Sequence, residues 1–99
     1  MSARDILHSP ETERLFRAVL SLENEEECAA FFEDLCTVKE LLSLSQRLEV
    51  ASMLREEKTY LEIGKKTGAS TATISRVNRS LGYGEDGYQL IFDRIEKKD

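Results

Sequence analysis

The sequence predicts an all-α fold of six or seven short helices, with a helix-turn-helix in the C-terminal half. Two observations indicate this class. Apolar residues recur at helical spacing along the chain, and the alternation expected of a half-buried strand is nowhere sustained. Residue patterns typical of helix starts also recur, and the chain has only one proline and no glycine- or serine-rich linker. We expect one helical domain that covers residues 1–99.

Two helices are expected in the first third of the chain. Ser9 followed by Pro10 is a common combination of N-cap and first helical residue. Asn24 begins a second helix, because the three glutamates after it suit the positive end of the helix dipole. The expected apolar stripes are Leu15, Phe16, Val19 and Leu20 in the first helix, and Cys28, Phe31, Phe32 and Leu35 in the second. The residues before Ser9, including His8, are expected to form a mobile tail.

Two further start signals lie in the middle of the chain. Thr37 to Glu40 has the spacing of a capping box and predicts a short helix. Ser45 offers a fresh N-cap, which predicts a separate helix over residues 46–57. The expected apolar residues are Leu41, Leu42 and Leu44 in the short helix, and Leu48, Ala51 and Leu54 in the longer one.

Three helices complete the chain. Thr59 to Glu62 repeats the capping-box spacing, and the helix that it starts is expected to end at Gly68. Ser70 caps the next helix, which runs to Gly82. The last helix has apolar residues at i, i+3, i+4 and i+7, namely Tyr88, Ile91, Phe92 and Ile95.

Residues 59–82 have the features that a helix-turn-helix requires. Its two helices need a small residue where they cross, and Gly64 provides one despite a helix-propensity cost of roughly 1 kcal/mol. The turn needs a residue that tolerates a positive φ, and Gly68 follows four residues later. The residues expected to face inward and hold the angle are Ile63, Ala69, Ile74 and Val77. This combination favours a helix-turn-helix over a chance pair of helices.

The second helix of this unit is expected to enter the major groove of DNA. Its first turn has small residues that let the backbone approach base edges, and Ala72 or the Thr71 methyl group could meet a thymine methyl. The neighbouring cations are expected to bind phosphates, although two lysines at a helix C-terminus also suit the helix dipole alone. The predicted DNA-binding residues are Lys65, Lys66, Ser70, Thr71, Ala72, Ser75 and Arg79.

The charge distribution permits this function. The chain has a net charge of −5, yet residues 58–82 contain five basic residues and one acidic residue, a local charge of +4 that leaves −9 for the rest. Because salt screens charges beyond about 8 Å, the acidic residues elsewhere are expected to matter little at the DNA-facing surface.

The sequence offers little for catalysis, for a cofactor or for a membrane. It contains no P-loop, dinucleotide or zinc pattern, and a single histidine, so we expect neither an enzyme nor a cofactor. Cys28 and Cys36 lack metal-ligand spacing and are expected to be free thiols in a reducing compartment. No apolar stretch approaches the ~20 residues of a membrane span, which predicts a cytoplasmic protein.

The neighbouring aromatic residues Phe31 and Phe32 indicate a helix with two packing partners. They cannot both lie on one narrow helical stripe, so we expect the N-terminal half to intertwine with a second copy of the chain. A helix that is simply central within its own monomer is the alternative.

The segment "SQRLEVASMLREEKTYLEIGKKTGASTATISRVNRSLGYG" resembles the Trp repressor superfamily. The family's signature is a Gly-Ala-x-x-Ala-Thr-Ile-[Ser/Thr]-Arg run followed by Asn-x-Ser-Leu, and the resemblance, in particular to the YerC/YecD-like branch, covers nearly the whole chain. It implies an intertwined, all-helical homodimer that binds a palindromic DNA operator through two reading heads about one helical turn apart. In the ligand-binding repressor, L-tryptophan lies between the reading head and the dimer core. Carried over by position, the residues of that pocket correspond here to Thr37, Arg47, Thr73, Arg76 and Ser80, with Val77 beside them.

Three positions depart from the family's pattern. The ligand-binding repressor has glycine in place of Val77 and leucines in place of Asp34 and Cys36. The Val77 isopropyl group would intrude into the space of an aromatic ligand, and an unpaired carboxylate beside an apolar pocket is costly. We therefore expect that tryptophan is not the effector. Arg47 and Arg76 could hold another anionic ligand, or pair with acidic residues such as Asp34 across the dimer.

The leading hypothesis is a sequence-specific transcriptional regulator, a repressor, that binds DNA as a homodimer. Two alternatives remain at this stage. The chain could be a protein-interaction module that keeps the helix-turn-helix shape and binds a basic partner through Glu23–Asp34, which has six acidic residues and no basic one. It could also be a sensor of an anionic small molecule.

Overall fold

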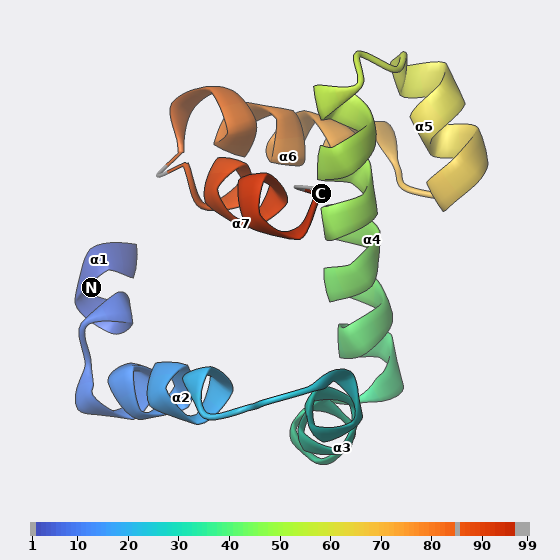
Figure 1. Cartoon of the computed structure of the whole chain (residues 1–99). Helices are drawn as coiled ribbons and strands as arrows, with labels where there is room; N and C mark the ends of the chain where they lie inside the picture. Colours follow the sequence, from blue (N-terminus) through green and yellow to red (C-terminus); the bar gives the residue numbers. More distant parts are fainter. Residues whose placement is uncertain (1, 85, 97–99) are drawn as a thin grey trace. The chain divides into compact units, whose positions relative to one another are not determined.

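The computed structural model describes residues 2–84 and 86–96, and these residues form seven α-helices and no strand (Figure 1). The helices are α1 (Ala3–Leu7), α2 (Pro10–Leu20), α3 (Glu25–Leu35), α4 (Val38–Arg55), α5 (Tyr60–Thr67), α6 (Thr71–Tyr83) and α7 (Gly87–Ile95). The predicted all-α class is confirmed. None of the helices in this part of the chain is both long and apolar enough to cross a membrane.

Helix α1 lies in the segment before Ser9, where the sequence predicted a tail and no helix. The backbone N–H of Asp5 donates to Ser2 Oγ at 3.2 Å, and the backbone N–H of Ser2 donates to Asp5 Oδ2 at 3.3 Å. This reciprocal capping box supports a helix of five residues that ends at Leu7, with His8 as its C-cap. The Ser-x-x-Asp spacing at residues 2–5 is the signal that the sequence analysis missed.

The helix starts predicted at Ser9 and Asn24 are confirmed. Ser9 Oγ accepts from the backbone N–H of Thr12 at 3.2 Å, and Asn24 Oδ1 accepts from that of Glu27 at 2.9 Å. Both cap residues have the extended backbone that an N-cap requires.

The chain divides by its internal contacts into two compact units, residues 1–38 and 39–99, and each is described on its own. In the N-terminal unit no residue of α1, α2 or α3 is buried. The stripe predicted on α2 stays largely in contact with solvent, and Leu20 is 83% exposed. On α3, the Phe31 and Phe32 rings meet edge to face at 5.5 Å between their centroids. The side of α3 that was predicted to be buried is therefore only partly covered, with Cys28, Phe31 and Phe32 partly buried and Leu35 50% exposed.

The break predicted at Ser45 is absent, because α4 is one continuous helix from Val38 to Arg55. No glycine or proline interrupts these residues, and an N-cap needs an extended backbone that a residue inside a helix cannot adopt. The helical phase therefore runs unbroken through Ser45. The buried residues agree only in part with those predicted. Val50, Ala51 and Met53 are in the core, whereas Leu48 is 37% exposed and Leu54 only partly buried.

The core of the C-terminal unit joins α4 to the three helices that follow it (Figure 1). It consists of Val50, Ala51, Met53, Ile63, Ala69, Ile74, Val77 and Phe92. The four residues predicted to hold the helix-turn-helix angle are all in this set. Of the apolar residues predicted for α7, Phe92 is buried and Tyr88 packs against the core, but Ile91 and Ile95 are exposed.

Arg55 ties α7 to the end of α4. Its guanidinium nitrogens lie 3.6 Å from Asp93 Oδ1 and 3.5 Å from Glu96 Oε1, and its Cζ lies 4.9 Å from the centre of the Phe92 ring. The Tyr88 and Phe92 rings stack with their centroids 6.3 Å apart. These contacts hold α7 in place, and α7 carries Tyr88 toward the pocket described below.

Candidate nucleic-acid interface

The turn between α5 and α6 depends on Gly68. Its backbone has a φ of 75° and a ψ of 6°, and its N–H donates to the Gly64 carbonyl at 2.9 Å. This left-handed conformation is cheap only for glycine, so the predicted reason for Gly68 is confirmed. Thr67 strengthens the turn, because its hydroxyl donates to the Ile63 carbonyl at 2.7 Å and accepts from the Ala69 N–H at 3.1 Å.

Gly64 needs to be small but does not need to be glycine. A Cβ atom built on it would lie 3.6 Å from the Ala69 carbonyl oxygen, an ordinary van der Waals distance. Alanine would therefore fit at this crossing.

The start of α6 matches the prediction and its end does not. Ser70 Oγ accepts from the Thr73 N–H at 3.1 Å and caps the helix. The helix passes Gly82 and ends at Tyr83, with Gly84 as its C-cap. A Cβ atom on Gly84 would overlap the Ser80 carbonyl, whereas one on Gly82 would have open space. The close approach of the backbone at Gly84 explains why glycine stands there.

Most of the predicted DNA-binding residues are accessible. Six are exposed, namely Lys65, Lys66, Ser70, Thr71, Ala72 and Arg79. Ser75 is only partly buried, so part of its surface still faces outward. The first turn of α6 contains no acidic residue, and the two lysines stand in the last turn of α5.

A groove of about 510 Å³ separates α5 from α6, and we refer to it as the α5–α6 groove. It is lined by Tyr60, Leu61, Gly64, Lys65, Ala69, Thr71 and Ile74. No role for Tyr60 was expected from the sequence, yet its hydroxyl accepts a hydrogen bond from Asn78 Nδ2 at 3.2 Å. The signal for this role in the sequence was an aromatic residue directly after Thr59, where the helix was predicted to start.

The structure brings together five of the six residues predicted for an effector pocket. Arg47, Thr73, Arg76, Val77 and Ser80 line a cavity of about 190 Å³ together with Ser43, Gln46 and Tyr88. Thr37 precedes α4 and belongs to the N-terminal unit. Within the described residues, no carboxylate pairs with Arg47 or Arg76. The cavity is therefore polar, cationic and small.

Ser43 and Gln46 were not predicted, because the pocket residues were carried over by position from the family's ligand-binding repressor. With one continuous helix, Ser43, Gln46, Arg47 and Val50 fall at i, i+3, i+4 and i+7 and share one face of α4. Gln46 also donates from Nε2 to the Thr67 carbonyl at 3.1 Å, so it links this face to the turn.

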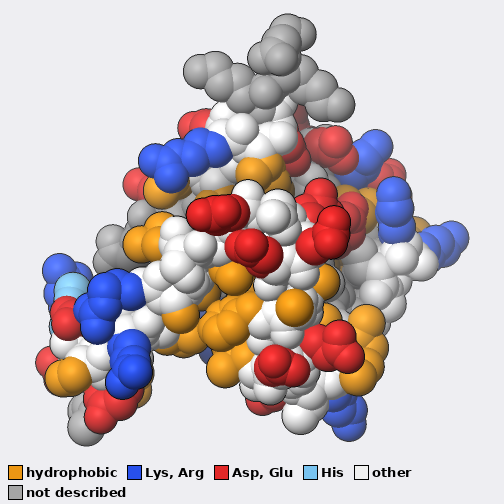
Figure 2. All heavy atoms as spheres, turned by 60° about the horizontal axis from the view of Figure 1, so that its bottom comes forward, with side chains coloured by type: hydrophobic (Ala, Val, Ile, Leu, Met, Phe, Trp, Pro, Cys, Tyr) orange, Lys and Arg blue, Asp and Glu red, His pale blue; other side chains and the backbone are white. Residues whose placement is uncertain are grey.

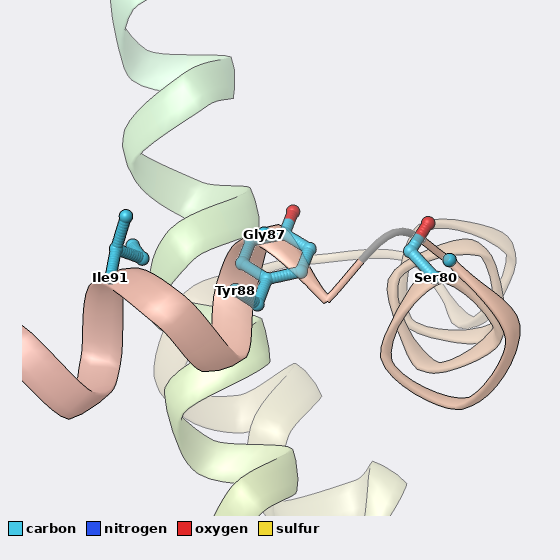
Figure 3. Close-up of a pocket in the computed structure, with 5 residues that line it drawn as sticks. Ser80, Gly87, Tyr88 and Ile91 are labelled. Carbon is cyan, nitrogen blue, oxygen red and sulfur yellow. The ribbon is translucent and has the colours of Figure 1, made fainter.

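A second hollow of about 410 Å³ opens between the end of α6 and the start of α7 (Figure 3). Ser80 of α6 stands across from Tyr88 and Ile91 of α7. Tyr88 and Ser80 line both this hollow and the cationic cavity.

Residues 11–96 match the family model described as Trp repressor protein. The chain belongs to the Trp repressor family. It is 55% identical to the protein YerC of Bacillus subtilis over 95 residues, which cover 96% of this chain and 91% of the relative. This family is one of regulators, and the resemblance drawn from the sequence is confirmed.

Two solved structures share the fold. A TrpR-like protein from Eubacterium eligens is 59% identical, with a TM-score of 0.90 over 96% of this chain and 98% of that one. A protein from Staphylococcus aureus described as a candidate Trp repressor is 51% identical, with a TM-score of 0.91 over 99% and 98% of the two chains. These similarities indicate a DNA-binding regulator.

Proposed function

We propose that this protein is a cytoplasmic, sequence-specific transcriptional repressor that reads the major groove of DNA as a homodimer. The observation that carries this proposal is the helix-turn-helix itself. Gly68 sets its turn, buried apolar residues hold its angle, and Thr71 and Ala72 are exposed at the start of α6. Helices docked in this way contact bases through their N-terminal residues.

The roles of the contacting residues follow from this docking. Ser70, Thr71, Ala72 and Ser75 contact base edges, where hydroxyl groups can donate or accept and methyl groups can meet thymine. Lys65, Lys66 and Arg79 bind phosphates and fix the position of the protein on the duplex. The exposure of the three cations and the local charge of +4 support this division.

The uncovered apolar surface supports the homodimer. Large apolar side chains of α2 and α3 that would stabilise a core are exposed, and Figure 2 shows hydrophobic side chains at the surface beside acidic ones. Exposed apolar patches of this kind usually mark interaction surfaces. A second copy of the chain covers them.

Selection of bound sequences from a random DNA pool tests this function. We expect an enriched palindrome whose half-sites lie about one helical turn apart. Its affinity should fall with salt by roughly 0.9 log units per log unit of salt for each phosphate neutralised. A pool without enrichment contradicts the proposal, and a protein partner that binds Glu23–Asp34 and excludes DNA would favour the interaction module.

The cationic cavity favours a second role, in which an anionic small molecule regulates DNA binding. Arg47 and Arg76 provide guanidinium groups without a described carboxylate partner, and Thr73 and Ser80 add hydroxyl groups. Because this cavity is only about 190 Å³ and Val77, with its isopropyl group, is among its lining residues, the proposed effector is not tryptophan. Selection repeated with candidate anionic metabolites tests the role, and micromolar binding of tryptophan in a calorimetric titration would contradict the exclusion.

A further inference from the structure

Leu61 is an apolar residue on a surface that the proposed function places against DNA. Its side chain is 70% exposed although it lines the α5–α6 groove. It precedes Lys65 by four residues, so both lie on the same face of α5. Thr71, the first residue of α6, lines the same groove. Leu61 therefore lies beside a proposed phosphate contact and a proposed base contact.

The groove around Leu61 is held firmly by its neighbours. Ala69 and Ile74 are both buried in the core and line the groove from inside. Tyr60 forms part of the wall, and its hydrogen bond with Asn78 joins α5 to α6 at 3.2 Å. Gly64 contributes no side chain, so the groove is not filled from the protein side. The exposed leucine thus stands at a groove whose walls are formed by core residues and by a hydrogen bond between α5 and α6.

The chemistry of the groove favours one kind of base. On the edge that a base pair presents in the major groove, the apolar group is the C5-methyl of thymine. Lys65 provides a positive charge at the groove, and no carboxylate is among the residues that line it. Glu62, the neighbour of Leu61, is exposed but does not line the groove. Apolar surface beside a cation fits a thymine and its phosphate backbone.

We infer that Leu61 contacts a thymine methyl group in each half-site and is a specificity-determining residue. The inference rests on the proposed DNA-binding function. It adds a base contact from α5, whereas the base contacts proposed above come from α6 and its cap.

Replacement of thymine by deoxyuridine, which lacks the methyl group, tests the contact. The operator is first obtained by selection, and its thymines are then replaced one symmetric pair at a time. For the wild-type protein, replacement of the symmetric pair of thymines that Leu61 contacts should weaken binding by about fourfold per half-site. This is the value expected for the loss of one buried methyl group. Leu61→Ala should bind the thymine and deoxyuridine operators equally at that pair, and Leu61→Met should keep the discrimination because it restores apolar volume.

The variants separate this contact from its alternatives. Leu61 is mostly exposed, so Leu61→Ala should keep the wild-type circular dichroism spectrum and its affinity for unrelated DNA. If Leu61→Ala still discriminates at every thymine, the methyl contact belongs to Thr71 or Ala72 and the inference is wrong. It is also wrong if the wild-type protein binds all substituted operators equally or selects half-sites without thymine. Failure of the selection itself would instead refute the proposed function, and this inference with it.

Discussion

Gly64 and Gly68 are four residues apart and serve different physical purposes. Gly68 has a positive φ of 75°, which a side chain with a Cβ atom adopts only at a cost. Gly64 lies inside α5, where its φ is ordinary and an added Cβ would make a normal contact with Ala69. Only position 68 therefore requires glycine, because only there does the turn need a positive φ.

Substitution by alanine at these two positions should change stability in opposite directions. We expect Gly68→Ala to lower the free energy of unfolding by about 1–2 kcal/mol, because it strains the turn. Gly64→Ala should raise it by about 0.5–1 kcal/mol, because alanine restricts the unfolded chain and favours the helix. Urea denaturation at one fixed protein concentration measures both. If both variants lost the same free energy of unfolding, the backbone conformation at position 64 would also require glycine.

Arg79 and Thr71 should affect DNA binding in different ways. Arg79→Ala removes a proposed phosphate contact, so it should weaken binding to all sequences alike and reduce the salt slope by about 1. Thr71→Val keeps the shape and removes the hydroxyl, so it should change the preferred sequence instead. Gel shifts on a panel of operators at several salt concentrations test both expectations. A sequence-dependent effect of Arg79→Ala would place that residue at a base.

At the scale of the elements, the continuity of α4 has a measurable consequence. Ser45 lies in the middle of the helix and is exposed, whereas Ser70 caps α6 through its hydrogen bond to the Thr73 N–H. Ser45→Ala should leave stability unchanged or raise it by up to about 0.5 kcal/mol, since alanine is the better helix former. Ser70→Ala should lower it by about 1 kcal/mol through loss of the cap. Thermal or urea unfolding distinguishes the two, and a loss at Ser45 as large as that at Ser70 would indicate a helix start there.

The attachment of α7 should depend on Arg55. Arg55→Ala removes a cation–π contact with Phe92 and two partly exposed ion pairs, and it should lower the free energy of unfolding by about 1 kcal/mol. Arg55→Lys keeps the charge without the planar guanidinium, so it should lose about half as much. Hydrogen exchange of the α7 amides locates the effect. Unchanged exchange in Arg55→Ala would mean that Phe92 packing alone holds the helix.

At the scale of the whole molecule, the exposed stripe of α2 should control the oligomeric state. We expect the wild-type protein to sediment as a dimer at micromolar concentration and Phe16→Glu to shift it toward monomer, because a charge would replace apolar surface at the proposed interface. Arg17→Glu introduces a glutamate about 100° around α2 from Phe16, away from the apolar stripe, and should leave the dimer intact. Sedimentation velocity measures all three, and a monomeric wild-type protein would contradict the proposed dimer.

Much of the fold and of the candidate site follows from local patterns. The N-caps Ser9, Asn24 and Ser70 were predictable because each bonds to a backbone N–H only three residues away. The positive φ of Gly68 was predictable because it too is a local feature, the glycine that ends a helix before a tight turn. The errors arose where local signals compete. A serine inside a helix resembles an N-cap, and α1 was missed because a five-residue helix leaves only a capping box as its mark.

The helical class, the helix-turn-helix, most helix starts and the family could all be predicted from the sequence, because they depend on hydrogen bonds and spacings within a few residues. The tertiary structure decided which apolar residues of α4 are buried, and it joined Gln46 and Tyr88 to the predicted cavity. It also revealed the α5–α6 groove with its exposed Leu61. These features depend on packing between helices that are distant in the sequence. The phase of one helix against another is set by the whole core and not by any local pattern.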